Sequence, residues 1–380
     1  MKIYADNAAT TPIDKVVLKE IMKYSKFYAN PSSKHELGEE ARKIIEKARL
    51  KIASFINAKE NEIIFTSGGS EGNNFIIKGL ARRYSNKKHI LISSIEHPSV
   101  IEPAISLEKE GFIIEKIKVD KEGILDLEDL KSKIRDDTLL VSVMHVNNEI
   151  GTIQPIEEVA KICREKKIFF HSDMVQSFKK INIDVKKIGI DFATFSGHKI
   201  NAPKGIGFVY IKEGNQIEPL IHGGGQERNL RSGTENVLGI VALAKAIEIK
   251  KDIEKIKEQR DFIIKELLKI EGTRLNGSLK KRVYNNINVS FYGIEGESLL
   301  LLLSRKGIYV STGSACSSHK LAESHVLKAI GVEPLYLNGS IRITLDLLTK
   351  KEIFYLIEKI KESVEYLRSI SPFKLEKEVK

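Results

Sequence analysis

Short apolar runs alternate with amphipathic stretches through the N-terminal two thirds of the chain. Apolar residues at helical spacing predict a long helix over residues 36–56, after a capping loop at residues 30–33. Further helices are expected near residues 75–80 and 99–109 and after Pro155, placed at the first helical position. Continuous apolar runs predict buried strands. These runs lie at residues 62–66, 89–94, 112–119, 138–146, 168–173, 192–196 and 205–211.

Strands that alternate with helices indicate right-handed crossovers and a mostly parallel sheet with both faces covered, the α/β class. Ligands bind at the carboxyl ends of the strands in such sheets. A polar residue follows an apolar run at five places: Ser70, His97, Asn148, Asp173 and Lys199. Folding alone gives no reason for all five, so the pattern predicts one site at this edge.

The C-terminal third has a different pattern. A long charged helix is expected over residues 239–270, crossing to a second domain. Strands are expected at residues 285–291 and 341–345, and helices at residues 297–305 and 349–368. Thr349 and Glu352 form a capping box that begins the last helix.

Length and composition fit a protein with two domains, or one large core with a smaller partner. The chain has 380 residues, of which 42% are hydrophobic and 30% charged. No apolar run approaches the ~20 residues of a membrane span, and the N-terminus has no secretory pattern. Cys163 and Cys316 are too far apart for a disulfide framework or zinc spacing, which favours a reducing cytosol.

The formal net charge of +11 has two interpretations. It could reflect affinity for nucleic acid or another polyanion, or a lysine-rich solvated surface. The lysines are scattered and interleaved with glutamates, so the second interpretation is favoured and no nucleic-acid partner is expected. The nine histidines show no metal-binding spacing, so no metal site is expected.

Lys199 comes directly after a predicted buried strand, where desolvation would lower its pKa and make the amine a nucleophile. A surface lysine on a loop is the plain alternative. Residues 67–74 place glycines and hydroxyls between a strand and a helix, which favours an anion site, although many such turns bind nothing. Residues 223–236 predict either a mobile loop that meets an anion or a solvated turn.

The two cysteines have different surroundings. Cys163 falls on the apolar face of a predicted helix, so a core thiol is expected. No apolar periodicity surrounds Cys316 within its glycine–serine loop, which favours a reactive thiol over an incidental one.

Together these groups fit pyridoxal phosphate. Lys199 could form a Schiff base, and Asp173 could face a pyridinium nitrogen. The turn at Gly69 and Ser70 could hold a phosphate, and His97 could stack on a flat ring.

Over nearly its whole length the chain resembles the cysteine desulfurases of the NifS/IscS kind, within the fold-type-I, aspartate aminotransferase-like superfamily. The matching motifs are Asp6–Pro12, Asn30–Ser33 with His35, Thr66–Glu71, Glu96-His97, His145–Gly151, Asp173 with Gln176, Ser196–Lys199, Arg231–Asn236, Gly313–Ser317 and Ser340–Arg342. Three departures stand out: Ser70 replaces a usual threonine, residues 171–176 are poorer in alanine, and Asp346-Leu347 replaces a usual Gly-Arg.

The resemblance implies a seven-stranded, mostly parallel sheet in a large domain of residues 14–256. Residues 1–13 and 257–380 would form a small α+β domain that carries the mobile Cys316 loop. Lys199 would bind the cofactor covalently, and His97 would stack on it and move protons. The other implied cofactor ligands are Gly69, Ser70, Asn148, Asp173, Gln176, Ser196, Gly197, His198 and, from the other subunit of a homodimer, Thr234. Arg342 would hold the substrate carboxylate, with Asn148 beside it.

The implied reaction converts L-cysteine to L-alanine. Cys316, as a thiolate, would take the sulfur as a persulfide and pass it to an iron–sulfur scaffold or a tRNA-thiolation partner. Cys316 could also serve as a transient iron–sulfur ligand shared with the scaffold. The implied location is the cytoplasm, with no membrane partner. The alternatives are a selenocysteine lyase or another pyridoxal phosphate lyase, and a non-catalytic sulfur carrier.

Overall fold

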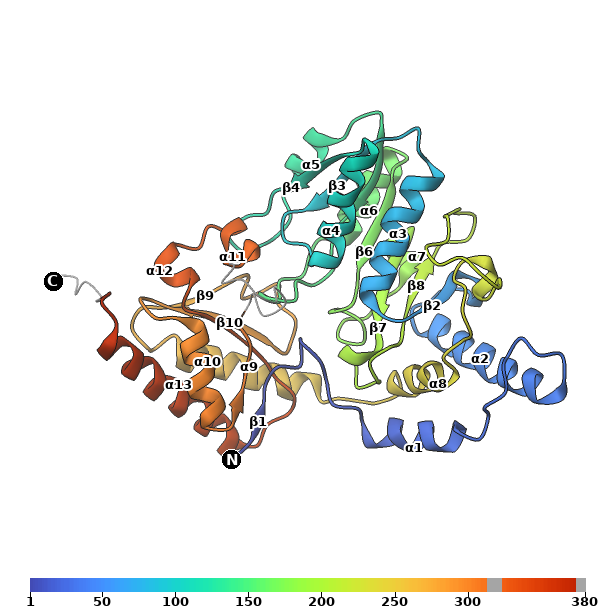
Figure 1. Ribbon diagram of the computed structural model, residues 1–380. Coiled ribbons are helices and arrows are strands. Elements are labelled where there is room, and N and C mark those ends of the chain that lie inside the picture. Colours follow the sequence, from blue (N-terminus) through green and yellow to red (C-terminus); the bar gives the residue numbers. More distant parts are fainter. Residues whose placement is uncertain (313–322, 374–380) are drawn as a thin grey trace.

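The computed structural model describes residues 1–312 and 323–373 (Figure 1). The predicted nucleophile, Cys316, lies outside the described residues. Figure 1 shows two lobes, and each lobe is built around its own sheet.

The larger lobe contains a seven-stranded sheet of order β2-β8-β7-β6-β5-β3-β4. β8 is antiparallel to both of its neighbours, and the other adjacent pairs are parallel, which confirms the mostly parallel α/β prediction. The strands are β2 (Ile63–Thr66), β3 (His89–Ser93), β4 (Ile113–Ile117), β5 (Thr138–Ser142), β6 (Phe169–Asp173), β7 (Phe192–Ser196) and β8 (Gly207–Ile211).

Helices cover both faces of this sheet and bury a separate apolar cluster on each face. They are α1 (Lys15–Tyr24), α2 (Glu36–Phe55), α3 (Gly69–Arg83), α4 (Pro98–Ser106), α5 (Leu127–Lys133), α6 (Ile156–Glu165), α7 (Val185–Ile188) and α8 (Val237–Ala246). α2 has the predicted extent, but its N-cap is His35, whose ring accepts a hydrogen bond from the Gly38 amide. Pro155 is likewise the N-cap of α6 and not its first helical residue. Cys163 is buried in the core, as predicted.

The smaller lobe has a three-stranded antiparallel sheet of order β12-β10-β9. Its strands are β9 (Thr273–Leu275), β10 (Asn286–Phe291) and β12 (Ser340–Thr344), and its helices are α9 (Ile253–Leu267), α10 (Gly296–Arg305), α11 (His325–Ala329), α12 (Pro334–Leu337) and α13 (Lys350–Ile370). β1 (Ile3–Tyr4) pairs in parallel with β11 (Ile308–Tyr309). The capping box of Thr349 and Glu352 begins α13 as predicted.

The single long helix predicted over residues 239–270 is wrong. The chain forms α8 and α9, which are separated by residues 247–252. α8 is apolar and mostly buried, whereas Asp252 begins α9 by accepting a hydrogen bond from the Lys255 amide. The predicted domain boundary at residues 256 and 257 falls inside α9, and the division into the two predicted domains stays a prediction.

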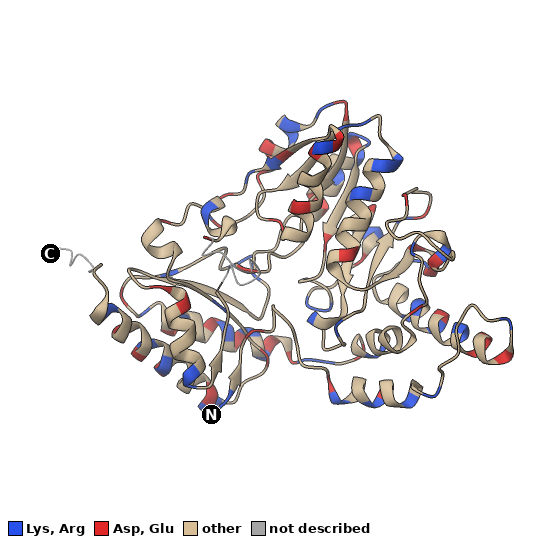
Figure 2. Ribbon diagram, viewed as in Figure 1, with Lys and Arg blue, Asp and Glu red and all other residues tan. Residues whose placement is uncertain are grey.

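The N-terminal segment crosses from the small lobe to the large one. Asn7 donates a side-chain hydrogen bond to the Thr344 carbonyl, and the Thr11 hydroxyl donates one to the His198 carbonyl. These contacts dock the N-terminal segment against both lobes. Basic and acidic residues alternate along α9 and α13, the interleaving expected of a solvated surface (Figure 2).

Candidate active site

Lys199 ends a single 3-10 turn, Gly197–Lys199, that follows β7. Its Nζ donates to the carbonyl oxygens of Ala8, at 2.5 Å, and Ala9, at 2.6 Å, in the docked N-terminal segment. The amine therefore lies at the carboxyl edge of the sheet, between the two lobes. The lowered pKa expected for it stays a prediction.

Asp173 lies at the end of β6, where its side chain is buried. One carboxylate oxygen accepts from the Val175 amide at 2.9 Å, and the other accepts from the Asn73 side chain at 2.8 Å. The same Asn73 amide also lies 2.9 Å from the Ser99 hydroxyl, which is 2.8 Å from Nδ1 of His97. A continuous polar chain thus connects the carboxylate to the imidazole.

His97 caps α4 with its own ring. The Ser99 amide donates to Nδ1 at 3.1 Å, so Nδ1 is the acceptor and Nε2 carries the proton of the neutral ring. Burial lowers the pKa of His97, and the nearby positive charge of Lys199 lowers it further, while Asp173 opposes the shift. The imidazole is therefore held neutral and in one orientation. Asn73 and Ser99 were not predicted; the only sequence signal was their place beside the glycine turn and His97.

The turn between β2 and α3 forms a narrow cradle at the N-terminus of α3. A Cβ atom added to Gly69 would lie 2.8 Å from Val175 Cγ2, and one added to Gly207 would lie 2.7 Å from Gly68 Cα. Neither position has room for a side chain. Ser70 is exposed in the first turn of α3, and Ser196 is buried beside Gly68. An anion is favoured there by the helix dipole.

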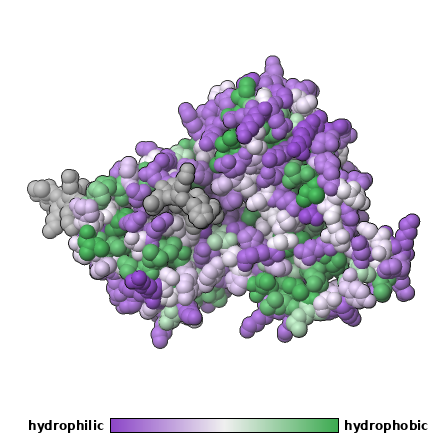
Figure 3. Space-filling model, viewed as in Figure 1, coloured by the Kyte–Doolittle hydropathy of each residue, from purple (hydrophilic) through white to green (hydrophobic). Residues whose placement is uncertain are grey.

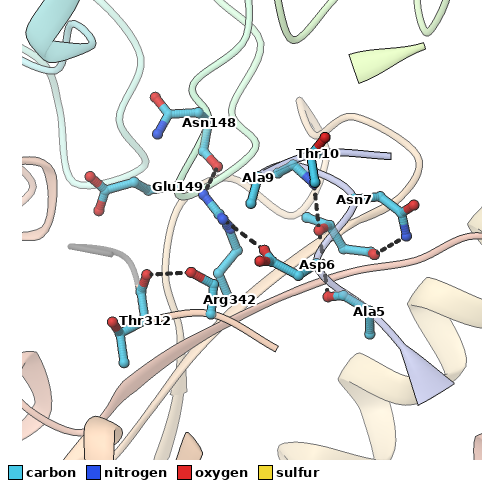
Figure 4. A network of polar contacts seen from close by, with 12 residues as sticks. Ala5, Asp6, Asn7, Ala9, Thr10, Asn148, Glu149, Thr312 and Arg342 are labelled. Carbon is cyan, nitrogen blue, oxygen red and sulfur yellow. Dashed lines mark hydrogen bonds and ion pairs between the residues drawn. The ribbon is translucent and has the colours of Figure 1, made fainter. Parts of the chain in front are cut away.

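Arg342, on β12, is the centre of a polar network that joins three distant segments (Figure 4). Its Nη2 donates to Asp6 Oδ1 at 2.9 Å, and its Nη1 donates to the Asn148 carbonyl at 3.0 Å. The arginine side chain is only 3% exposed. Asp6 was not predicted as a site residue, because its partner is 336 positions away in the sequence.

The remaining predicted ligands surround Lys199. Gln176 donates to the Ala8 carbonyl and accepts from Lys180 Nζ. Burial lowers the pKa of Lys180 to about 7, helped by the charge of Lys199. His198 Nδ1 lies 3.1 Å from the Thr10 hydroxyl, and burial lowers the pKa of this imidazole to about 4.

Thr234 is exposed on the loop that follows β8, where it lines a hollow with Ser67 and Gly205. Its predicted role at the phosphate site of the other subunit stays a prediction. The same loop is tied to α3 by the ion pair of Arg231 and Glu71.

No three His, Cys, Asp or Glu side chains lie close enough to hold a metal ion in the described part of the chain. Within residues 1–312 and 323–373, no helix combines the length and apolar character that a membrane crossing needs.

The donor set fits pyridoxal 5′-phosphate. A glycine cradle at a helix N-terminus suits the phosphate, a buried carboxylate suits the ring nitrogen, and a lysine lies at the adjoining strand end. The fold and the site thus define a pyridoxal phosphate-dependent enzyme.

Comparison with known proteins narrows this class. Residues 3–353 match the family model described as aminotransferase class-V. The cysteine desulfurase IscS of Dictyoglomus turgidum is 50% identical over 384 aligned residues, covering 99% of this chain and 98% of the relative. The chain belongs to the class-V aminotransferase family and, within it, to the NifS/IscS-like cysteine desulfurases.

Solved structures agree. A structure titled NIFS-like protein superposes with a TM-score of 0.91 at 40% identity, covering 97% of this chain and all of the other (100%). A second, titled SspA in complex with cysteine, has a TM-score of 0.83 at 36% identity, with coverage of 91% and 99%.

Proposed function

We propose that this enzyme converts L-cysteine to L-alanine and transfers the sulfur to Cys316 as a persulfide. The observation that carries the proposal is the convergence of Lys199, Asp173 and His97 at one sheet edge, in a chain of this family. Pyridoxal phosphate, when bound, withdraws electrons from the substrate and weakens the bonds around its α-carbon.

We assign cofactor binding to the residues around the cradle. The α3 turn, with Gly69 and Ser70, would take the phosphate, together with Ser196, Gly197 and His198. Asp173 would face the ring nitrogen, because its two hydrogen-bond donors hold the carboxylate in one orientation. Gln176 would contact the ring oxygen, and Asn148 would lie beside the ring.

Three side chains of the protein would each have a separate role in the reaction of the substrate. Lys199 Nζ would hold the cofactor and accept a proton when cysteine takes its place. His97 would move protons through Nε2, because Nδ1 is occupied by the Ser99 amide. Arg342 would orient the substrate carboxylate, because Asp6 and the Asn148 carbonyl fix its guanidinium plane.

Cys316 would complete the reaction as a thiolate that attacks the substrate sulfur. A new S–S bond forms, the bond between carbon and sulfur breaks, and its electron pair stays on the carbon, which leaves as alanine after protonation. The sulfur would then pass to an acceptor, for which an iron–sulfur scaffold is the proposed class, as the IscS names of the relatives suggest.

We further propose a cytoplasmic homodimer in which Thr234 completes the phosphate site of the other subunit. Two features support this assembly. Thr234 is exposed, so it is accessible to a second subunit. Apolar residues gather over α1 and α8 (Figure 3), and Val16, Leu18 and Met22 of α1 are exposed.

The test combines absorbance with product analysis. Purified protein should be yellow, release alanine from L-cysteine and carry a persulfide on Cys316. Cys316→Ala should stay yellow and lose turnover, because only the acceptor thiol is removed. Undiminished sulfide release by Cys316→Ala would refute the assigned role, and a protein that cannot be loaded with the cofactor would refute the reaction.

A further inference from the structure

Ser311 and Ser324 precede and follow Cys316 in the sequence, and both contact the network around Arg342. Upstream, the backbone of Ser311 pairs with that of Arg342: the Arg342 amide donates to the Ser311 carbonyl at 2.7 Å, and the return bond is 3.1 Å. Downstream, the Ser324 hydroxyl donates to Glu149 Oε2 at 2.6 Å. The chain is therefore held beside the proposed substrate site at Ser311 and at Ser324, which precede and follow Cys316 in the sequence.

Glu149, the partner of Ser324, is itself held in place by neighbouring residues. It directly follows Asn148, whose carbonyl accepts from Arg342 (Figure 4). Its own carbonyl accepts from the side chains of Asn286 and Asn288, each at 3.1 Å, and its amide donates to Asn147 Oδ1 at 2.9 Å. The carboxylate is buried, so its bond to Ser324 does not compete with bulk water.

α11, which Ser324 caps, is packed against the large lobe. Val326, Leu327 and Ile330 share a buried cluster with three residues of the large-lobe loops. These three residues are Ile95, Met144 and Ile150. His325 Nε2 also lies 2.9 Å from the Glu96 carbonyl, next to His97. α11 is thus held by the loops that carry His97 and Asn148.

We propose that Glu149 and Ser324 form a positioning contact that promotes sulfur transfer from the substrate held at Arg342 to Cys316. The inference rests on the proposed function. Neither residue touches the cofactor cradle, so the contact acts on sulfur transfer to the thiol and not on cofactor or substrate binding. A purely structural role would instead lower stability and cofactor retention without separating these steps.

The central variant is Ser324→Ala, studied as the holoenzyme. In single-turnover experiments with L-cysteine, persulfide formation on Cys316 should slow about tenfold, the effect of losing one buried hydrogen bond. The affinity for L-cysteine, measured by the cofactor spectrum in a Cys316→Ala background, should stay within about twofold. Ser324→Thr, which keeps the hydroxyl, should restore the rate.

A second pair of variants separates positioning from folding. Ser324→Ala also removes a helix cap, since the hydroxyl accepts from the Leu327 amide at 3.1 Å. Thr349→Ala removes the matching cap of α13, far from the site, and should leave persulfide formation unchanged. Glu149→Gln keeps the volume and one acceptor oxygen, so it should give the same separation with a smaller loss of rate, even where Ser324→Ala folds poorly.

Four results would overturn the proposal: a wild-type rate in Ser324→Ala, an equal fall in rate and affinity, an equal slowing by Thr349→Ala, or a wild-type rate in Glu149→Gln. A parent enzyme that forms no persulfide on Cys316 would refute the proposed function itself, and this inference with it. The first four results leave the proposed function intact.

Discussion

Replacing Glu96 by glutamine should change how stability depends on pH. The side chain is fully buried beside His97. Oε1 accepts from the Ser93 hydroxyl at 2.6 Å and the Met144 amide at 2.7 Å, while Oε2 has no hydrogen-bond partner in the described structure. Burial raises the pKa of Glu96 from 4.5 to about 8, although both hydrogen bonds oppose the shift. The native protein therefore holds a proton that the unfolded chain has already released.

The sign and the size of the change in unfolding free energy follow from this difference in bound protons. Between pH 4.5 and about 8 the native state binds more protons than the unfolded state, so the free energy of unfolding falls as pH rises through this window. At about 1.4 kcal/mol per pKa unit, the loss approaches about 5 kcal/mol over the window, and about half of that between pH 6 and 8. Glutamine mimics the protonated acid and does not titrate, so Glu96→Gln should escape the loss.

Urea denaturation of the holoenzyme at pH 6, 7 and 8, at fixed cofactor concentration, measures the effect. The variant should be more stable than wild type already at pH 6, and its advantage in the free energy of unfolding should grow by about 2.5 kcal/mol between pH 6 and pH 8. Buried histidines with lowered pKa values, such as His145 and His171, contribute equally to both proteins and cancel in the difference. Glu254→Gln, on the exposed side of α9, should parallel wild type. Parallel curves for Glu96→Gln would refute the assignment of a buried neutral acid.

Three further predictions concern other parts of the chain. Arg342→Lys should raise KM for L-cysteine by about tenfold or more and leave the cofactor spectrum unchanged, because a single ammonium cannot bridge Asp6 and a substrate carboxylate. An unchanged KM in steady-state kinetics would contradict this prediction. Gly207→Ala should weaken cofactor affinity by about tenfold or more in a spectroscopic titration, because the new Cβ would lie 2.5 Å from the Phe195 carbonyl oxygen. A wild-type affinity would contradict the assignment of the phosphate site to this turn. Cys163→Ala should leave turnover unchanged, because burial raises the pKa of this thiol and keeps it unreactive, and the loss of buried volume should cost about 1 kcal/mol of stability. Rapid labelling of Cys163 by a thiol reagent in the native enzyme would contradict this prediction.

The strand-edge part of the site could be predicted from the sequence, and the reason is geometric. Lys199, Asp173 and His97 each follow a buried run, and the carboxyl ends of parallel strands share one edge. Asn73 and Ser99 connect these groups but carry no pattern of their own. A polar side chain in a turn has many possible partners until the fold selects one.

Local sequence patterns could not predict contacts between residues that lie far apart in the sequence. Asp6 meets Arg342 across 336 positions, and Ser324 meets Glu149 across 175, so neither pair leaves a periodic signal. The helix predicted over residues 239–270 failed for a different reason. Its helical propensity is continuous, and the break between α8 and α9 reflects their packing in different cores.

The docked N-terminal segment bears on how the enzyme matures during synthesis. β1 pairs with β11, and Asp6 joins Arg342 on β12, so residues 3–6 must wait for partners that are synthesised much later. The large sheet can assemble while translation continues, but the carbonyl oxygens of Ala8 and Ala9 are held beside Lys199 only once β12 has emerged. Nascent chains released early should therefore form the large sheet without completing the catalytic centre.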